Sequence, residues 1–113
     1  MKIGYNLNMK TITIPELHHA VQSLKNQDLI LDVRTPGEFA AGHIPKAKNI
    51  PVDQVMNHAS ELKQYASVYV YCRSGGRVTA CSGILAPMGV TNLICVDDGG
   101  FPDWEEAGYP VEK

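Results

Sequence analysis

The sequence contains no long hydrophobic run and no strong excess of charge of either sign. A helix that crosses a bilayer needs about 20 consecutive apolar residues, and no stretch of the chain approaches that length. Ten basic residues against twelve acidic ones leave a formal net charge of -2, so charge-driven binding to nucleic acid or to a membrane surface is not expected. The N-terminal residues also lack the apolar core and the small-residue cleavage site of a signal peptide. We therefore expect a cytoplasmic protein without nucleic-acid or membrane partners.

Cysteine is scarce as well, and its count is odd. Three cysteines exclude a complete internal disulfide framework, and thiols stay reduced in the cytoplasm. No pair of cysteines has the C-x-x-C spacing that structural zinc sites use, so we expect neither a metal nor another cofactor. At least one thiol is therefore a candidate for chemistry.

What the chain does contain is an alternation of short apolar runs and helical patterns. Its 113 residues and 12.4 kDa suit one domain over 1–113, with 1–9 expected to be a poorly ordered N-terminal extension. The repeated β-then-α order is typical of an α/β fold, here a central, mostly parallel five-stranded sheet with helices on both faces. The expected strands are 11–13, 29–33, 50–52, 68–71 and 92–96. The expected helices run from Thr13 to about Lys25, from Thr35 to about Gly42, up to about Tyr65, from about Arg77 to Ala86, and around Trp104.

Two capping boxes support the first two of these helices. In a capping box a Ser or Thr begins the helix, and a Glu three residues later returns the hydrogen bond. Thr13 with Glu16 and Thr35 with Glu38 have this spacing, and a proline lies in the first turn of both segments. Both positions are therefore expected to be helix starts.

The loop after the expected strand 68–71 is the strongest candidate for chemistry. It reads Cys72-Arg73-Ser74-Gly75-Gly76-Arg77. A cysteine placed before a helix N-terminus feels the helix dipole and converging backbone N–H groups, which favour the nucleophilic thiolate. The two glycines allow the backbone to form an anion-binding nest, and Arg73 and Arg77 supply forked donors for the same anion. A lone cysteine is more often a small buried hydrophobic residue, but the glycines and arginines favour a functional loop.

Acidic residues are absent around this cysteine. Between Leu62 and Val96 the chain has no Asp or Glu but contains Lys63, Arg73 and Arg77, which is a local charge of +3. Two of the three arginines in the chain bracket the loop. This stretch predicts an anionic substrate.

These motifs make the sequence similar to the rhodanese family of sulfurtransferases. The loop 72–77 resembles the six-residue active-site loop of that family. Upstream, the stretches LDVRTPGEF (31–39), GHIP (42–45) and AKNIP (47–51) resemble its first signature. Gly99-Gly100-Phe101 with Trp104, followed by GYPV (108–111), resembles its C-terminal signature. Three motifs in the order of the family cover nearly the whole chain.

The resemblance implies a small rhodanese-like domain that acts as a thiosulfate sulfurtransferase without a cofactor. Cys72 would attack the outer sulfur of thiosulfate, release sulfite and hold a persulfide, and cyanide or a thiol would then take the sulfur in a ping-pong reaction. Backbone N–H groups of the loop would stabilise the persulfide and the leaving anion, and Arg77 and Arg73 would bind the sulfonate end of the small anionic donor. The substrate-binding residues would be Arg73, Ser74, Gly75, Gly76 and Arg77.

Two alternative functions stay open. In the first, the Cys72 persulfide belongs to a sulfur-relay module that delivers sulfur only to a protein partner, such as a thioredoxin-like or sulfur-relay protein. In the second, the protein is a cysteine-dependent phosphatase or an arsenate reductase. The phosphatases place five residues between cysteine and arginine, where this chain has four. The shorter loop suits a sulfur atom better than a tetrahedral phosphate, so sulfur transfer is favoured.

Other polar and sulfur-containing residues are assigned supporting or structural roles. Asp32 and Arg34 are expected to support the site, with Asp32 pairing with Arg34 or holding a loop rather than acting as a base. Cys81 and Cys95 are expected in the core, and a resolving disulfide between Cys81 and Cys72 is a minor alternative.

The histidines are not expected to take part in catalysis. His18, His19 and His58 are expected to be solvated. His43 lies within the first family-like signature and is expected to make a structural hydrogen bond. The single tryptophan, Trp104, is expected to pack the last helix onto the sheet.

Overall fold

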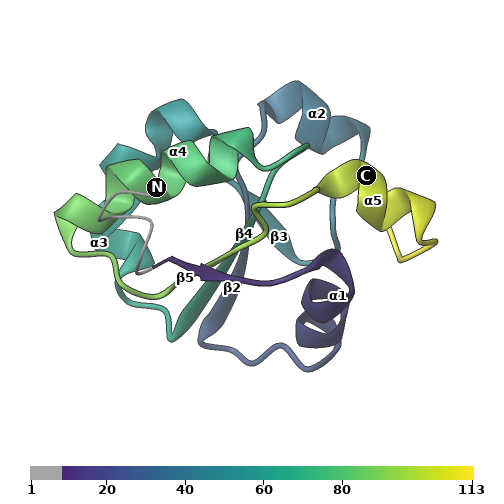
Figure 1. Ribbon diagram of the computed structural model, residues 1–113, viewed down its shortest axis with the longest axis horizontal. Coiled ribbons are helices and arrows are strands. Elements are labelled where there is room, and N and C mark those ends of the chain that lie inside the picture. Colours follow the sequence, from purple (N-terminus) through teal and green to yellow (C-terminus); the bar gives the residue numbers. More distant parts are fainter. Residues whose placement is uncertain (1–8) are drawn as a thin grey trace.

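The protein is described by a computed structural model of residues 9–113. The expected N-terminal extension, 1–9, lies outside the described residues except for Met9. Within the described part, five parallel strands form one sheet in the order β1-β5-β4-β2-β3 (Figure 1). The strands are β1 (Lys10–Thr11), β2 (Asp28–Asp32), β3 (Ala47–Asn49), β4 (Ser67–Tyr71) and β5 (Leu93–Cys95).

Helices cover both faces of this sheet. The α-helices are α1 (Ile14–Gln22), α2 (Pro36–Ala41), α3 (Ala59–Leu62), α4 (Gly76–Leu85) and α5 (Phe101–Glu106), and the 3-10 segments are η2 (Val52–His58) and η3 (Ala86–Met88). Figure 1 shows α1 and α5 on one side of the strands and α3 and α4 on the other. The predicted α/β fold with a parallel sheet between two helical layers is confirmed.

Alternating side chains of the central strands supply two separate cores, because successive residues of a strand point to opposite faces. On β2, Leu31 joins the core formed with η2, α3 and α4, whereas Ile30 joins the core formed with α1 and α5. On β4, Val70 and Tyr71 divide in the same way. Tyr71 therefore lies on the α5 side of the sheet, directly before the candidate loop.

Both predicted capping boxes are present. The Thr13 hydroxyl accepts from the Glu16 amide at 3.2 Å, and the Glu16 carboxylate accepts from the Thr13 amide at 2.8 Å. Thr35 and Glu38 repeat the arrangement at 3.2 and 3.0 Å. The second box also anchors the Glu38 side chain at the end of the sheet where the candidate loop lies.

The strand expected around Pro51 lies earlier in the chain. The pairing with β2 covers Ala47–Asn49, and the Ile50 amide still donates to the Asp32 carbonyl at 3.0 Å. Pro51 has no amide hydrogen and cannot continue this pattern of donors. The chain turns there into η2, so the apolar residues on either side of the proline do not form a strand of their own.

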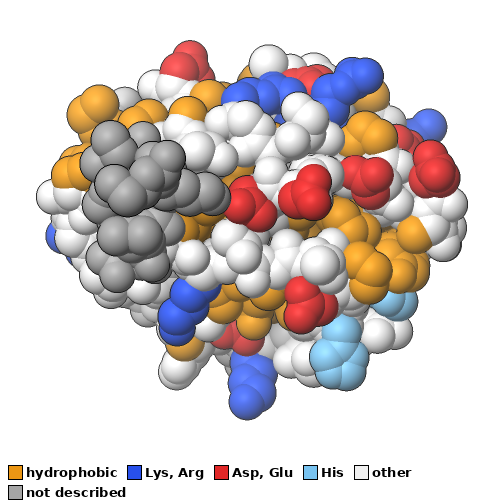
Figure 2. All heavy atoms as spheres, in the orientation of Figure 1, with side chains coloured by type: hydrophobic (Ala, Val, Ile, Leu, Met, Phe, Trp, Pro, Cys, Tyr) orange, Lys and Arg blue, Asp and Glu red, His pale blue; other side chains and the backbone are white. Residues whose placement is uncertain are grey.

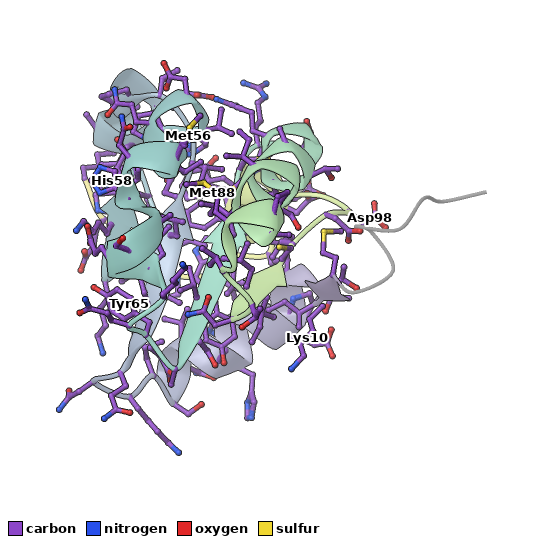
Figure 3. All side chains as sticks on the ribbon, turned by 90° about the vertical axis from the view of Figure 1, so that its left-hand side faces the viewer. Lys10, Met56, His58, Tyr65, Met88 and Asp98 are labelled. Atoms are coloured by element: carbon purple, nitrogen blue, oxygen red, sulfur yellow. The ribbon has the colours of Figure 1, made fainter. Side chains whose placement is uncertain are left out.

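Two of the three histidines expected to be solvated are half-buried instead. The His18 ring stacks on Tyr109, with ring centroids 3.8 Å apart. His58 Nδ1 lies 3.0 Å from a carboxylate oxygen of Glu61, on the side of the molecule that Figure 3 turns toward the viewer. His19 is exposed, as predicted. The two errors have different causes, because His18 meets a residue from the far end of the chain, whereas His58 meets Glu61 only three residues along.

The C-terminal segment returns to the end of the sheet beside α2. His43 and Glu112 exchange backbone hydrogen bonds of 2.8 and 2.9 Å, and His43 Nδ1 lies 2.8 Å from the Phe39 carbonyl. Trp104 is fully buried and its indole N–H donates to the Pro110 carbonyl at 2.7 Å. The structural roles predicted for His43 and Trp104 are both confirmed.

Few large apolar side chains are exposed among the described residues. Met56 on η2 and Met88 on η3 are 56% and 38% exposed, and Figure 3 shows both on the helical face opposite α1. Among residues 9–113, every helix is too short or too polar to cross a membrane.

Candidate functional site

The site lies where the chain changes direction across the sheet. From β2 the chain adds β3 on one side, and β4 and β5 lie on the other side. In open parallel sheets, such a switch between neighbouring strands leaves a crevice at their carboxyl ends, where ligands bind. Asp32 at the end of β2, Arg34 just after it and Cys72 just after β4 lie at this end of the sheet.

Cys72 follows β4 directly and is 1% exposed. The amide of Gly75 donates to its Sγ at 3.1 Å, which requires the chain to curl back within three residues. Gly75 achieves this with φ +101°, and a Cβ there would lie 2.1 Å from the Asp97 carbonyl oxygen. A glycine is therefore needed at this position both for the turn and for the space.

A second glycine locks the loop against the chain that follows β5. A Cβ on Gly100 would lie 2.3 Å from the carbonyl oxygens of both Cys72 and Arg73. The Phe101 amide donates to the Cys72 carbonyl at 2.9 Å. The loop that holds Cys72 and the segment 97–100 thus form one interlocked unit.

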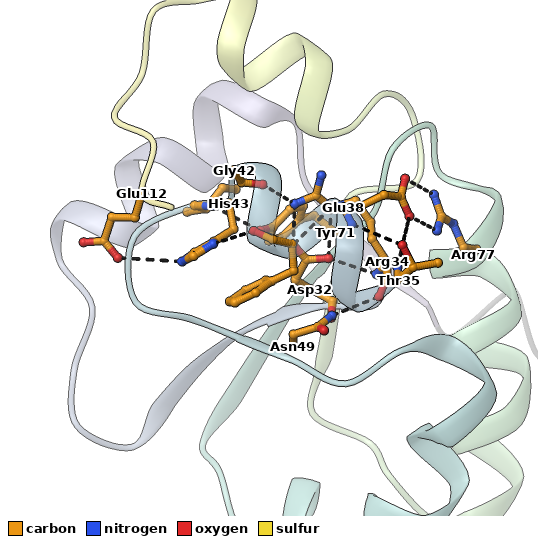
Figure 4. Close-up of polar contacts among 12 residues, drawn as sticks. Asp32, Arg34, Thr35, Glu38, Gly42, His43, Asn49, Tyr71, Arg77 and Glu112 are labelled. Carbon is orange, nitrogen blue, oxygen red and sulfur yellow. Dashed lines mark hydrogen bonds and ion pairs between the residues drawn. The ribbon is translucent and has the colours of Figure 1, made fainter.

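Asp32 and Arg34 form a buried pair beneath the loop, as the sequence predicts (Figure 4). Arg34 Nη2 and Nε lie 2.7 and 3.0 Å from the two Asp32 carboxylate oxygens, and the Arg34 amide also donates to Asp32 at 2.9 Å. The Tyr71 hydroxyl donates to the same carboxylate at 2.6 Å and accepts from the Ile44 amide at 3.1 Å. Burial, followed by the charge of Asp32, raises the pKa of Tyr71 well above its ordinary value.

The guanidinium of Arg34 also connects this network to α2 and α5. Nη2 donates to the Gly42 carbonyl at 2.6 Å, and the guanidinium carbon lies 4.3 Å from the centre of the Phe101 ring. Burial disfavours the charge of Arg34, but the hydrogen bonds and charge of Asp32 outweigh burial and raise the pKa of Arg34. Arg34 therefore keeps its positive charge, and its hydrogen bonds to Asp32 and Gly42 hold it in place.

Arg77 is occupied by a partner that the sequence pattern did not reveal. Its guanidinium donates to both carboxylate oxygens of Glu38, at 2.6 and 3.1 Å. The hydrogen bonds from Arg77 lower the pKa of Glu38 to about 2. The position at Arg77 that was expected to bind a sulfonate is therefore filled by a carboxylate of the protein itself.

Arg73 differs from the other arginines because it has no ion-pair partner within the described part of the chain. Arg73 and Ser74 are both exposed at the tip of the loop. Figure 2 shows Lys and Arg side chains along the edge where α2 and α4 begin, and acidic side chains beside them over the chain from β5 into α5. The acid-free stretch 62–96 is therefore acid-free only along the sequence, since Glu38 and the acidic segment 97–106 close around it in space.

A hollow of about 370 Å³ lies beside the loop, between α2 and α5. Its polar lining comes from Arg34, Glu38, Arg73 and Glu105, and Phe101 adds an aromatic ring. A larger hollow, about 670 Å³, lies at the opposite ends of the strands around Lys25 and Asp28, and it contains neither cysteine nor histidine. Of these two hollows, the smaller one adjoins the loop 72–77, through Arg73.

The other two cysteines are core residues, as predicted. Cys81 and Cys95 are fully buried free thiols, and burial raises the pKa of each to about 12. The alternative of a disulfide between Cys81 and Cys72 is not formed here. Residues 9–113 also contain no group of three or more His, Cys, Asp or Glu side chains placed to hold a metal ion.

Tyr71, Phe101 and Glu38 contact the site but were assigned other roles from the sequence. Tyr71 matched a strand pattern and Phe101 a packing pattern, and Glu38 matched a helix cap. Glu38 and Tyr71 lie 39 residues from the partners that they bind. A single sequence carries no signal for contacts at that separation.

Comparison with known proteins agrees with this geometry. The Rhodanese-like domain family matches residues 13–107. The chain is 34% identical over 83 residues to a sulfurtransferase of Allochromatium vinosum, which covers 74% of this chain and 77% of that protein. It is 32% identical over 88 residues to the thiosulfate sulfurtransferase GlpE of Pseudomonas putida, which covers 78% of each chain.

A solved structure extends the likeness to three dimensions. A rhodanese-related protein of Thermoplasma volcanium superposes with a TM-score of 0.76 at 29% sequence identity, over 91% of this chain and 97% of that one. The fold, the matched range 13–107 and the sequence identities agree. The chain belongs to the rhodanese-like family.

Proposed function

We propose that this protein is a sulfurtransferase that carries sulfane sulfur on Cys72. The observation that carries the proposal is the position of Cys72 at the carboxyl end of the central strand β4, with the Gly75 amide 3.1 Å from its Sγ. A backbone donor aimed at sulfur stabilises a thiolate and, after reaction, a persulfide. The two named sulfurtransferases among the relatives support the same chemistry.

The reaction proceeds in two displacements. The Cys72 thiolate attacks the outer sulfur of thiosulfate, the sulfur–sulfur bond of the donor breaks, and sulfite leaves with the electron pair. An acceptor thiol or cyanide then attacks the outer sulfur of the persulfide and restores Cys72. Thiosulfate is the proposed donor and a small thiol, cyanide, a thioredoxin-like protein or a sulfur-relay protein the proposed acceptor, acting in the cytoplasm.

Within this proposal the residues around Cys72 have separate tasks. Arg73, which has no ion-pair partner among the described residues, attracts the anionic donor. Arg77 reaches the donor by exchanging its Glu38 carboxylate for the sulfonate. Asp32 and Arg34 act as positioning residues, because their buried pair holds the segment after β2 and the floor of the hollow.

Intact mass spectrometry with thiosulfate tests the proposal. Wild-type protein is expected to gain the mass of one sulfur atom and to produce thiocyanate when cyanide is added. Cys72→Ser is expected to lose both, whereas Cys95→Ala, which changes a core thiol, keeps both. An adduct without turnover on small acceptors would point to a relay module, and no adduct at all would overturn the proposal.

A further inference from the structure

The hollow beside Cys72 carries two charges that the protein itself does not neutralise. Four ionised side chains line it. Asp32 holds Arg34, and Arg77 holds Glu38. The other two, Arg73 and Glu105, have no ion-pair partner within residues 9–113, and both are exposed. The hollow therefore presents one free positive and one free negative group.

A buried donor adds to the positive side of the hollow. The Arg34 side chain is only 6% exposed, and its Nε and Nη2 are used by Asp32 and Gly42. No hydrogen-bond acceptor for its Nη1 is found among the described residues, and the Arg34 side chain lines the hollow. An arginine fixed in this way offers a pre-oriented N–H to an oxygen.

The size and position of the hollow suit a small acceptor. Its volume of about 370 Å³ is at the lower end of small-ligand pockets. Arg73, next to Cys72 in the chain, and Phe101, whose amide binds the Cys72 carbonyl at 2.9 Å, both line it. Cys72 itself is not part of the lining, so a molecule held there lies beside the loop that carries the cysteine.

We infer that this hollow binds the sulfur acceptor, and that the acceptor is a small zwitterionic aminothiol of the α-amino acid type. Its carboxylate binds Arg73 and Arg34 Nη1, and its ammonium binds Glu105. Its thiol faces Cys72. The inference rests on the proposed sulfurtransferase function and specifies the class of acceptor.

The transfer step balances without any further reactant. The acceptor thiolate attacks the outer sulfur of the protonated Cys72 persulfide, and a new sulfur–sulfur bond forms on the acceptor. The bond between that sulfur and Cys72 Sγ breaks, and its electron pair returns to Cys72 as thiolate. The acceptor leaves as a hydropersulfide that keeps the proton, so sulfane sulfur moves with no net oxidation of the pair.

Single-turnover discharge of the persulfide tests the inference. The protein is loaded with thiosulfate and freed of excess donor. Loss of the sulfur adduct is then followed with four thiols. L-cysteine carries both a carboxylate and an ammonium, 3-mercaptopropionate only the carboxylate, and cysteamine only the ammonium. 2-Mercaptoethanol carries neither. Rates are compared per thiolate, using the measured thiol pKa of each probe. We expect L-cysteine to react about tenfold faster than 2-mercaptoethanol, because the rate effects of two partly exposed ion pairs multiply.

Variants that remove one charge test which residue binds the carboxylate of the acceptor and which binds its ammonium. Glu105→Gln is expected to slow L-cysteine and cysteamine about two- to fivefold and to spare 3-mercaptopropionate. Glu106→Gln is the matched control, because Glu106 is the exposed neighbour on α5 that does not line the hollow. Arg73→Gln is expected to slow L-cysteine and 3-mercaptopropionate more than cysteamine.

A binding measurement decides the inference even where loading fails. Amide NMR spectra are recorded with L-serine, which has the same charges as L-cysteine but no thiol, and with propionate and ethanolamine. Saturable shifts at Gly42, Phe101 and Glu105 with L-serine, weakened by Glu105→Gln, support the zwitterion site. Equal rates for all four thiols, or no shifts with L-serine, overturn the inference. Failure to form the adduct overturns the proposed function instead.

Discussion

Two carboxylate–arginine pairs flank Cys72, and they differ above all in burial. Asp32 and Arg34 are 0% and 6% exposed at their side chains, whereas Glu38 and Arg77 are 29% and 32% exposed. The shortest nitrogen–oxygen distances are nearly equal, 2.7 and 2.6 Å. These distances alone would therefore predict that the two ion pairs are equally strong.

Their surroundings give them opposite uses. The buried pair also binds Tyr71 and Gly42, so neither partner can leave without stranding the other in a poorly solvated place. Water solvates the half-exposed pair, which makes the separation of its partners cheap. The first pair therefore maintains the shape of the site, and in the proposed function the second exchanges its carboxylate for a substrate anion.

Breaking the buried pair is expected to cause the largest loss of stability. Asp32→Asn leaves the charge of Arg34 uncompensated and should lower the free energy of unfolding by about 3–5 kcal/mol. Urea denaturation measures this loss, with the exposed Asp53→Asn as a control expected to change stability by less than about 0.5 kcal/mol. A loss below about 1 kcal/mol would show that the buried pair contributes no more to stability than an exposed pair does.

Removing one hydrogen bond from the same network should have a smaller effect. Tyr71→Phe deletes the hydroxyl that donates to Asp32 and accepts from Ile44, at an expected loss of about 1–3 kcal/mol of unfolding free energy. Tyr69→Phe is the matched control on the same strand, because its hydroxyl has no hydrogen-bond partner among the described residues. Equal losses for the two variants would contradict the assigned role of Tyr71.

The half-exposed pair is expected to contribute a modest stability that depends on acid pH. Arg77 lowers the pKa of Glu38 from 4.5 to about 2, so the pair stabilises the fold fully above about 4.5 and ceases to do so as the pH falls through about 2. Solvent screening limits this contribution to about 1 kcal/mol. The stability difference between wild type and Glu38→Gln should therefore shrink by that amount over this range, and a difference independent of pH would argue against the pair.

Releasing Arg77 from Glu38 is expected to strengthen the binding of an anionic donor. Glu38→Gln removes the competing charge and should lower KM for thiosulfate about two- to fivefold with little change in kcat. Glu16→Gln makes the same change in the other capping box, on α1, and should leave KM unaltered. A KM that stays the same or rises in Glu38→Gln would mean that Arg77 does not exchange partners.

The parts of this molecule that were predictable from the sequence rest on short separations. The capping boxes span three residues, and the Asp32–Arg34 pair spans two. Short apolar runs located the strands, and the order of strands and helices indicated the parallel topology of the sheet. The position of Cys72 at a strand end followed from the same local patterns.

Most of the unpredicted parts depend on long-range contacts. Arg77 and Glu38 meet only because α2 and α4 begin at the same edge of the sheet. For this reason, the charge of +3 counted along the chain overstated the positive charge of the loop. His18 was misassigned because its partner Tyr109 comes from the far end of the chain.

The glycines at 75 and 100 determine how this site can be transplanted. Each leaves room for a carbonyl of the other segment, as close as 2.1 and 2.3 Å to where a Cβ would lie. A graft of 72–77 alone into another scaffold would therefore lack the segment against which this loop packs. The smallest unit that can be moved to another scaffold is therefore the pair of segments 72–77 and 97–101, which must be transferred and varied together.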